Sequence, residues 1–207
     1  MSEENEICQS DIESKKRLVA VALQTKVAEL ESILPKDAFD FKDFYFAGGC
    51  IYSIWNGKEV KDYDIFCKSK KAIEKLKRYF GENKGKTNII TNNAITMGKY
   101  QFVIRHIGKP EVEVMKFDFK HNMAYYDTDG LAAVSGWEYI NSNKLEFNSE
   151  RARDVLNIIS RIPKFVGRGM EISQKEIFDI LELGTRPTKI FSERASIKKS
   201  RKGKSRY

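Results

Sequence analysis

The spacing of apolar and polar residues along the chain predicts helices that alternate with short strands. From Asp11 to Leu34, apolar residues recur at helical intervals between charged ones, and Pro35 ends the pattern. We expect this helix to cover a sheet. Further helices are predicted at 50–55, 68–80, 150–164 and 174–183. Ser173 opens the last of these, with Glu176 in the capping-box position.

Short apolar and β-branched runs predict the strands. They lie at 44–47, 60–67, 88–91, 94–97 and 100–107. A short helix begins at Pro110, residues 122–126 fit either a strand or a helix, and 127–130 form a turn. The run 137–147 is predicted to be a hairpin around Asn141-Ser142-Asn143.

Composition restricts the class of protein. With 207 residues, 41% apolar and 32% charged, the chain suits one substantial soluble domain with a small appendage. Its apolar runs fall short of the roughly 18 residues that span a membrane, and its acidic N-terminus argues against a signal peptide. Three cysteines without metal-site spacing favour a reducing cytoplasm. The two histidines have no paired ligand either and are interpreted as structural.

The net charge of +8 is concentrated at the C-terminus. Seven basic residues and no acidic ones lie between Arg194 and Tyr207, which leaves 8 − 7 = +1 for the rest. They are Arg194, Lys198, Lys199, Arg201, Lys202, Lys204 and Arg206. Such a tail is either an arm that binds nucleic-acid phosphates or a solubilising end, and composition does not choose between the two.

The segment from Phe44 to Phe66 carries the candidate chemistry. Gly48-Gly49 joins a predicted strand to a predicted helix, where backbone N–H groups can approach a phosphate. Asp62 and Asp64 are separated by one residue, so their side chains leave the same face of a strand. Two like charges held that close repel each other, and a divalent cation between them and a phosphate is the usual remedy. The alternative for this pair is a polar strand end.

These residues resemble the signature of the polymerase-β-like nucleotidyltransferase superfamily. Gly48-Gly49, Gly57 and Lys61-Asp62-Tyr63-Asp64 stand at the same intervals as in the head domain of bacterial-type CCA-adding enzymes and poly(A) polymerases. Residues 116–127 are similar to the Arg-Arg-Asp-Phe-Thr-x-Asn-Ala-Met-Ala-Tyr-Asp segment of those enzymes, and 154–170 resemble their neck helix. The resemblance covers roughly residues 42–172 and implies an α+β fold, a mixed palm-like sheet flanked by helices with a short helical neck.

The resemblance also implies roles for individual residues. Asp62 and Asp64 would bind Mg²⁺ or Mn²⁺. Gly48, Gly49 and Ser53 would hold the triphosphate of an NTP, and Lys61 and Arg105 would stabilise the departing pyrophosphate. Asn122, Arg161 and Lys164 are candidates for the base or acceptor side, with a surface or interdomain contact as the equal alternative. Independently of the resemblance, the charge of the tail makes Lys198, Lys199, Arg201 and Lys202 candidate nucleic-acid contacts.

Two departures from the family pattern bear on activity. The family has Arg-Asp shortly after the glycines, whereas this chain has Tyr52-Ser53. The expected third carboxylate is replaced by the run Tyr100-Gln101-Phe102, so Asp118 is predicted as the third catalytic acid, with Glu113 as a second candidate. The family holds tRNA with body and tail domains that follow the neck. This chain has only a short stretch after its neck-like segment, so we do not expect an ordinary CCA-adding role.

These inferences predict four segments and one enzyme class. The segments are a covering helix at 1–40, a palm-like domain at 41–135, a neck-like segment at 136–190 and a basic tail at 191–207. The predicted activity is metal-dependent transfer of a nucleoside monophosphate from an NTP to a hydroxyl, with RNA as the favoured acceptor. A protein or small-molecule acceptor, or a catalytically inactive nucleotide- or RNA-binding module, are the alternatives.

Overall fold

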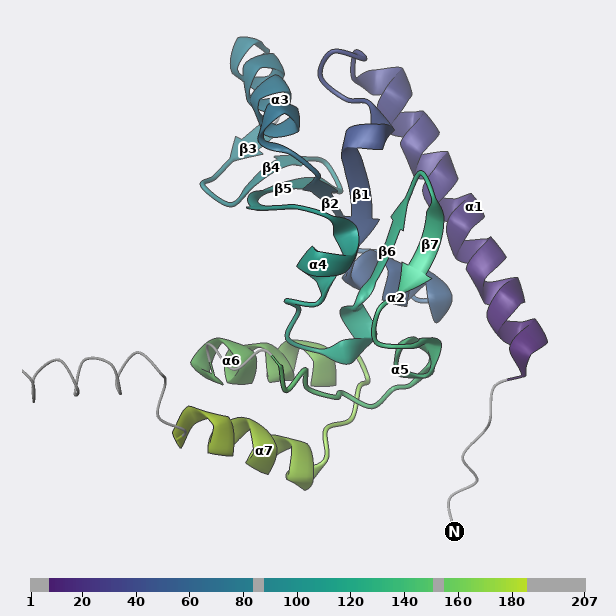
Figure 1. Ribbon diagram of the computed structural model, residues 1–207, viewed down its shortest axis with the longest axis vertical. Coiled ribbons are helices and arrows are strands. Elements are labelled where there is room, and N and C mark those ends of the chain that lie inside the picture. Colours follow the sequence, from purple (N-terminus) through teal and green to yellow (C-terminus); the bar gives the residue numbers. More distant parts are fainter. Residues whose placement is uncertain (1–7, 84–87, 151–154, 186–207) are drawn as a thin grey trace, which may run out of the picture.

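The computed structural model describes residues 8–83, 88–150 and 155–185, and within them a single seven-stranded sheet (Figure 1). Its strand order is β3-β4-β5-β2-β1-β6-β7. The strands are β1 Phe44–Ala47, β2 Tyr63–Cys67, β3 Asn88–Ile90, β4 Ala94–Met97, β5 Tyr100–Ile107, β6 Ala124–Asp127 and β7 Gly130–Ala133. β2 and β5 run parallel and the other neighbouring pairs are antiparallel, so the predicted mixed α+β sheet is confirmed.

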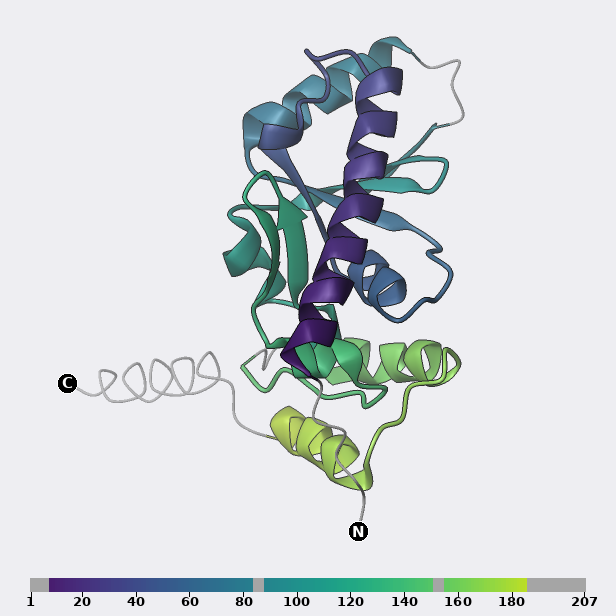
Figure 2. The same cartoon turned by 90° about the vertical axis from the view of Figure 1, so that its right-hand side faces the viewer.

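Helices lie on both faces and at one end of this sheet. They are α1 Gln9–Ile33, α2 Gly49–Trp55, α3 Lys70–Glu82, α4 Pro110–Val114, α5 Trp137–Asn141, α6 Val155–Val166 and α7 Gln174–Thr185, with 3-10 turns η1 Phe41–Asp43 and η2 Lys120–Asn122. α1 crosses the sheet along its length, while α6 and α7 lie together beyond one end (Figure 2). Among the described residues, no helix combines the length and apolar composition that crossing a bilayer requires.

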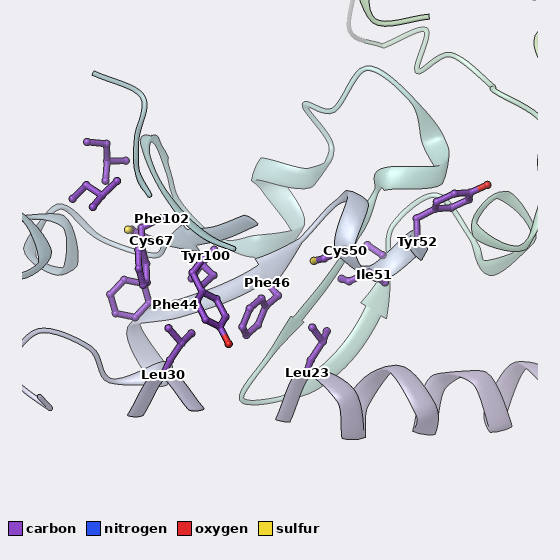
Figure 3. Packing of buried hydrophobic residues seen from close by; sticks show 14 of the residues in the cluster. Leu23, Leu30, Phe44, Phe46, Cys50, Ile51, Tyr52, Cys67, Tyr100 and Phe102 are labelled. Atoms are coloured by element: carbon purple, nitrogen blue, oxygen red, sulfur yellow. The ribbon is translucent and has the colours of Figure 1, made fainter. Parts of the chain in front are cut away.

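Alternation along the strands assigns the two faces of the sheet. Phe44 and Phe46 point toward α1, where Leu23 and Leu30 are fully buried against the same cluster (Figure 3). The intervening Tyr45 lies on the opposite face with Phe66 and with Val114 of α4. α1 therefore covers one face, as predicted, and the second face remains for the functional site.

The predicted hairpin at 137–147 is wrong: residues 137–141 form the helix α5, and Lys144 and Phe147 form isolated bridges to Glu171 and Phe119 instead of pairing within the segment. The ring of Trp137 stacks on that of Trp55, at the end of α2, with centroids 4.8 Å apart. Ile140 is fully buried, and the side chain of Asn141 accepts a hydrogen bond from the Trp55 indole N–H (3.0 Å). These contacts come from distant segments, and they outweigh the local turn preference of Asn141-Ser142-Asn143.

The C-terminal helices follow the prediction more closely. The Ser173 hydroxyl accepts from the Glu176 N–H (3.1 Å), which confirms the cap of α7. The Glu176 carboxylate, however, accepts from the Phe147 N–H (3.0 Å), so it ties α7 to the preceding loop. The boundaries proposed near residues 40, 135 and 190 stay predictions, and the basic tail lies outside the described residues.

Candidate active site

A cavity of about 530 Å³ opens on the second face of the sheet, between the palm and α6. It is lined by α2, by the segment 58–64, by the loop 117–122 and by residues 161–170. Its volume falls within the range typical of pockets for single small-molecule ligands. Both signs of charge line the cavity. The acidic lining residues are Glu59, Asp62, Asp64 and Asp118, and the basic ones are Lys58, Lys61, Arg161, Lys164 and Arg168.

The predicted acid pair lies in this cavity. Asp62 directly precedes β2 and is exposed, whereas Asp64 lies within the strand and is partly buried. Burial, and then the charge of Asp62, raise the pKa of Asp64 to about 6, while Lys164 on α6 acts in the opposite direction. A carboxylate that is desolvated and repelled in this way favours a cation beside it.

The glycine pair occupies the adjacent turn. Gly48 has φ +81, a backbone conformation that residues with a side chain rarely adopt, so this position favours glycine. Its N–H donates to the Ala124 carbonyl (3.1 Å). A Cβ on Gly49 would meet nothing within 4 Å. Gly49 is therefore the place where the backbone is open to an approaching phosphate.

The position opposite Asp64 on the parallel strand is occupied by Gln101. Since the two residues are in register, their side chains leave the same face of the sheet. An amide at this position cannot replace a carboxylate in charge. Val103 and Phe66, on the same two strands, line the cavity, whereas Gln101 is not among its lining residues.

Asp118, the predicted third acid, lies in the same cavity but has another partner. It is 5% exposed and accepts a hydrogen bond from the Arg161 guanidinium of α6. Its loop is fixed by Asn148, whose side-chain amide donates to the carbonyls of Met115 (2.8 Å) and Phe117 (3.0 Å). The ion pair joins the palm to α6, because Asp118 lies in the palm and Arg161 lies on α6. Glu113, the other candidate, is absent from the cavity lining and pairs with Lys116 (2.6 Å).

The remaining predicted residues divide into two groups. Ser53, Lys61, Asn122 and Lys164 all line the cavity. Arg105 does not: it is exposed on β5, and the structure does not bring it to the acid pair. The four tail cations Lys198, Lys199, Arg201 and Lys202 lie outside the described residues.

The lining residues that were not predicted as functional include Lys58, Arg168 and His121. Lys58 follows α2, Arg168 follows α6, and His121 is buried. The His121 ring makes edge contacts with Tyr52 and Phe165, with centroids 4.8 Å away in each case. Local sequence gave no signal for this group because Lys58 and Arg168 are 110 residues apart.

The donor set fits a divalent cation held jointly with a ligand. The described residues contain no cluster of three or more His, Cys, Asp or Glu side chains arranged for a metal. Asp62 and Asp64 alone supply two carboxylates, and Mg²⁺ is commonly bound by one or two carboxylates together with substrate phosphates and water. The two residues therefore suit Mg²⁺ that arrives with a phosphate.

Comparison with known proteins identifies the family. A sequence model of the Gabija anti-defense 2 family matches residues 22–150, which is more than half of the chain. The chain belongs to the Gabija anti-defense 2 family. It is 28% identical over 144 residues to a protein of Bacillus phage SPbetaL7 named Gabija anti-defense 2. That match covers 65% of this chain and 36% of the phage protein, so the chain spans about a third of its relative's length.

Two solved structures have a fold similar to that of this chain. The chain is similar to the Bacillus stearothermophilus CCA-adding enzyme in complex with CTP, with a TM-score of 0.55 and 16% identity over 76% of this chain and 42% of that one. It is also similar to the Thermotoga maritima CCA-adding enzyme complexed with tRNA, with a TM-score of 0.52 and 11% identity over 86% and 43%. The fold expected from the resemblance is thereby confirmed, and the chain spans less than half the length of each of these enzymes.

Proposed function

We propose that this chain is a metal-dependent nucleotidyltransferase that moves a nucleoside monophosphate from an NTP to a hydroxyl, with RNA as the favoured acceptor. The observation that carries the proposal is the acid pair Asp62 and Asp64 in a cavity of nucleotide size, beside the open backbone at Gly49. The nucleotidyltransferase fold supports it. We also place the reaction in the cytoplasm, as the cysteine content favours.

The residues of the cavity suit such a transfer. The acceptor hydroxyl releases its proton to solvent and its oxygen bonds to the α-phosphorus, while the bond from that phosphorus to the oxygen that bridges to the β-phosphorus breaks and pyrophosphate leaves. Asp62 and Asp64 would hold Mg²⁺ or Mn²⁺, whose chemistry there is to neutralise phosphate charge and to acidify the attacking hydroxyl. Lys61 and Lys164 line the same cavity and would balance the negative charge that develops.

We further infer that this activity is directed against a bacterial defence system. Membership of the Gabija anti-defense 2 family supports the inference. The transferred nucleotide would then modify a molecule on which the defence depends. An RNA acceptor and a protein or small-molecule acceptor are both compatible with this purpose.

A binding module without catalysis is the second candidate. Two observations favour it: Gln101 stands opposite Asp64, and Asp118 is paired with Arg161. Such a module would bind a nucleotide or RNA without transferring anything.

A labelling assay separates the candidates. The protein is incubated with each α-labelled NTP, Mg²⁺ or Mn²⁺, and either total RNA or a bacterial extract. Its companions are the Asp62→Asn/Asp64→Asn variant and the control Asp37→Asn, which changes an exposed acid outside the cavity. Label incorporated by the parent and the control, but not by the double variant, supports transfer. The labelled band identifies RNA or protein as the acceptor. Nucleotide binding without incorporation under any condition supports the inactive module.

The defence role has its own test. Cells that carry the Gabija system are infected with a sensitive phage while they express the parent, the double variant or the control. We expect the parent and Asp37→Asn to restore plaques and the double variant to lose this effect. Restoration of plaques by all three proteins would show that the anti-defence role does not depend on Asp62 and Asp64.

A further inference from the structure

Helix α7 lies at the outer end of the molecule, on the side of α6 that faces away from the sheet (Figures 1 and 2). Its inner side is anchored at three points. Ile180 is 1% exposed and belongs to the main core. The Glu176 carboxylate accepts from the Phe147 N–H (3.0 Å), and a Cβ on Gly184 would lie 3.5 Å from the Val155 side chain of α6. These contacts hold α7 in one orientation, so its outer side is a defined surface.

The outer side of α7 is apolar. Ile177 is 39% exposed, Phe178 66% and Leu181 50%. Leu181 follows Ile177 by four residues and Phe178 by three, so the three side chains share one face of the helix. We call these three residues the α7 stripe. A helix that packs on one side only carries polar residues on its other side, and a continuous exposed apolar face marks an interaction site.

A charged flank runs beside the α7 stripe. Lys175, Asp179 and Glu182 are spaced by four and then three residues, so they lie along one side of the helix. Lys175 is in the first turn and is exposed, while Glu182 is in the last turn and is exposed as well. Within one chain, Lys175 pairs with Asp179 (3.0 Å). The flank is thus basic at one end of α7 and acidic at the other.

This pattern is complementary to itself. When a two-fold axis relates two antiparallel copies of α7, the same flank of both helices lies on the same side of the contact. If Phe178 packs against Leu181 of the second copy, Lys175 comes level with the last turn of the second helix, which carries Glu182. The symmetry repeats both contacts. In a parallel pair the two charged flanks would lie on opposite sides and would not meet.

We propose that α7 is a dimerisation helix, on which a second copy of this chain packs antiparallel, with Phe178 against Leu181 and Lys175 beside Glu182. The inference does not depend on the proposed nucleotidyltransferase activity. The 12 residues of α7 give a contact about 18 Å long. Such a contact falls at or below the low end of stable interfaces, about 1,200 Å² in total, so the dimer is weak and forms with increasing concentration.

Sedimentation velocity of the full chain tests the proposal. The protein is measured up to a few hundred micromolar, with a reducing agent present because Cys8 is exposed and could form a disulfide. We expect the parent to change from monomer to dimer. Phe178→Gln and Leu181→Gln should each weaken dimerisation about tenfold or more, because the symmetry removes two contacts per substitution. Leu18→Gln is the matched control: this leucine is 56% exposed on α1, and its variant should dimerise like the parent.

Charge reversal tests the antiparallel register. Lys175→Glu and Glu182→Lys each place like charges together, so each should weaken dimerisation about fivefold or more at low salt. An equimolar mixture of these two variants should form mixed dimers. The double variant Lys175→Glu/Glu182→Lys should recover the dimerisation of the parent. Damage to the helix would not produce such recovery, and thermal unfolding verifies that every variant is folded.

Three outcomes would overturn the proposal. A parent that stays monomeric at every concentration excludes a second copy, and the α7 stripe then binds another protein or residues 186–207 of the same chain. Dimerisation that survives Phe178→Gln, or that Leu18→Gln weakens equally, places the contact elsewhere. Failure of the double charge reversal to recover the dimer excludes the antiparallel pairing. None of these measurements involves nucleotide transfer, so the dimer and the proposed activity can fail separately.

Discussion

At the scale of single residues, Asp64 carries a charge that the fold disfavours. Burial, and then the charge of Asp62, raise the pKa of Asp64 to about 6 in the folded state. Between roughly pH 4 and 6, the folded state therefore binds more protons than the unfolded chain. The free energy of unfolding therefore decreases as pH rises through this window, and the ionised group costs on the order of 2 kcal/mol above it.

Asp64→Asn should remove this cost. In metal-free buffer we expect the variant to unfold at a higher urea concentration than the parent at pH 7.5, with little difference at pH 4. Asp37→Asn, in an exposed loop, should change neither value. A gain for Asp64→Asn that is the same at both pH values would contradict the repulsion argument.

The two adjacent glycines should respond differently to alanine. Gly48→Ala should destabilise by about 1–2 kcal/mol, because its φ of +81 lies in a backbone region that residues with a Cβ rarely adopt. Gly49→Ala should leave stability equal or higher, since it begins α2 and meets nothing within 4 Å. The same Cβ would obstruct a phosphate, so we expect Gly49→Ala to reduce label transfer about tenfold. Thermal unfolding and the labelling assay measure the two effects, and full activity in Gly49→Ala would exclude close phosphate approach.

At the scale of elements, α6 is attached to the palm by the ion pair of Arg161 with the buried Asp118. Arg161→Met removes the cation that balances this carboxylate, and we expect a loss of about 1–3 kcal/mol in the free energy of unfolding. Adding Asp118→Asn should recover part of that loss, because the remaining group is then neutral. Urea unfolding of the two single variants and the double variant gives the coupling energy. Purely additive effects would show that the pair does not hold α6.

Elements with strong local patterns could be predicted from the sequence. α3 was expected at 68–80 and lies at Lys70–Glu82, with Ile73, Leu76 and Phe80 buried as the helical spacing requires. β4 and β5 match their expected bounds. α5 was missed because its stability comes from a distant partner, Trp55. Periodicity within a segment contains no information about such a partner. β7 was missed although it pairs with the neighbouring β6 across a short turn, because its run Gly130–Ala133 has no alternation of apolar and polar residues.

At the scale of the whole molecule, the excess charge lies at the C-terminus, outside the described residues. Removal of 194–207 takes away seven positive charges and leaves a net charge near +1. If the tail binds RNA phosphates, its deletion should weaken RNA binding and flatten the dependence of log K on log salt, by about 0.7 for each phosphate that the tail neutralises. Fluorescence anisotropy with single-stranded RNA at several salt concentrations measures this slope. An unchanged slope would favour the solubilising interpretation.

The site itself was predictable only in part, because it is assembled from distant segments. The spacing of Gly48, Gly49, Asp62 and Asp64 was visible within 17 residues of sequence, and the structure places all four at the cavity. Arg105 was predicted to stabilise the departing pyrophosphate, but it lies on β5 and does not line the cavity. The meeting of Lys58 with Arg168, and of Asp118 with Arg161, depends on where α6 returns to the palm.

The stacked rings of Trp55 and Trp137 also give the protein an optical signal of its own. They are the chain's two tryptophans, with centroids 4.8 Å and planes 14° apart, so their electronic transitions couple in circular dichroism. Trp55 closes the same short helix that Gly49 opens. A ligand that moves this helix relative to α5 would change the coupled signal. Nucleotide titrations can therefore be followed without a dye or a radioactive label, and each single Trp→Phe variant provides the uncoupled reference spectrum.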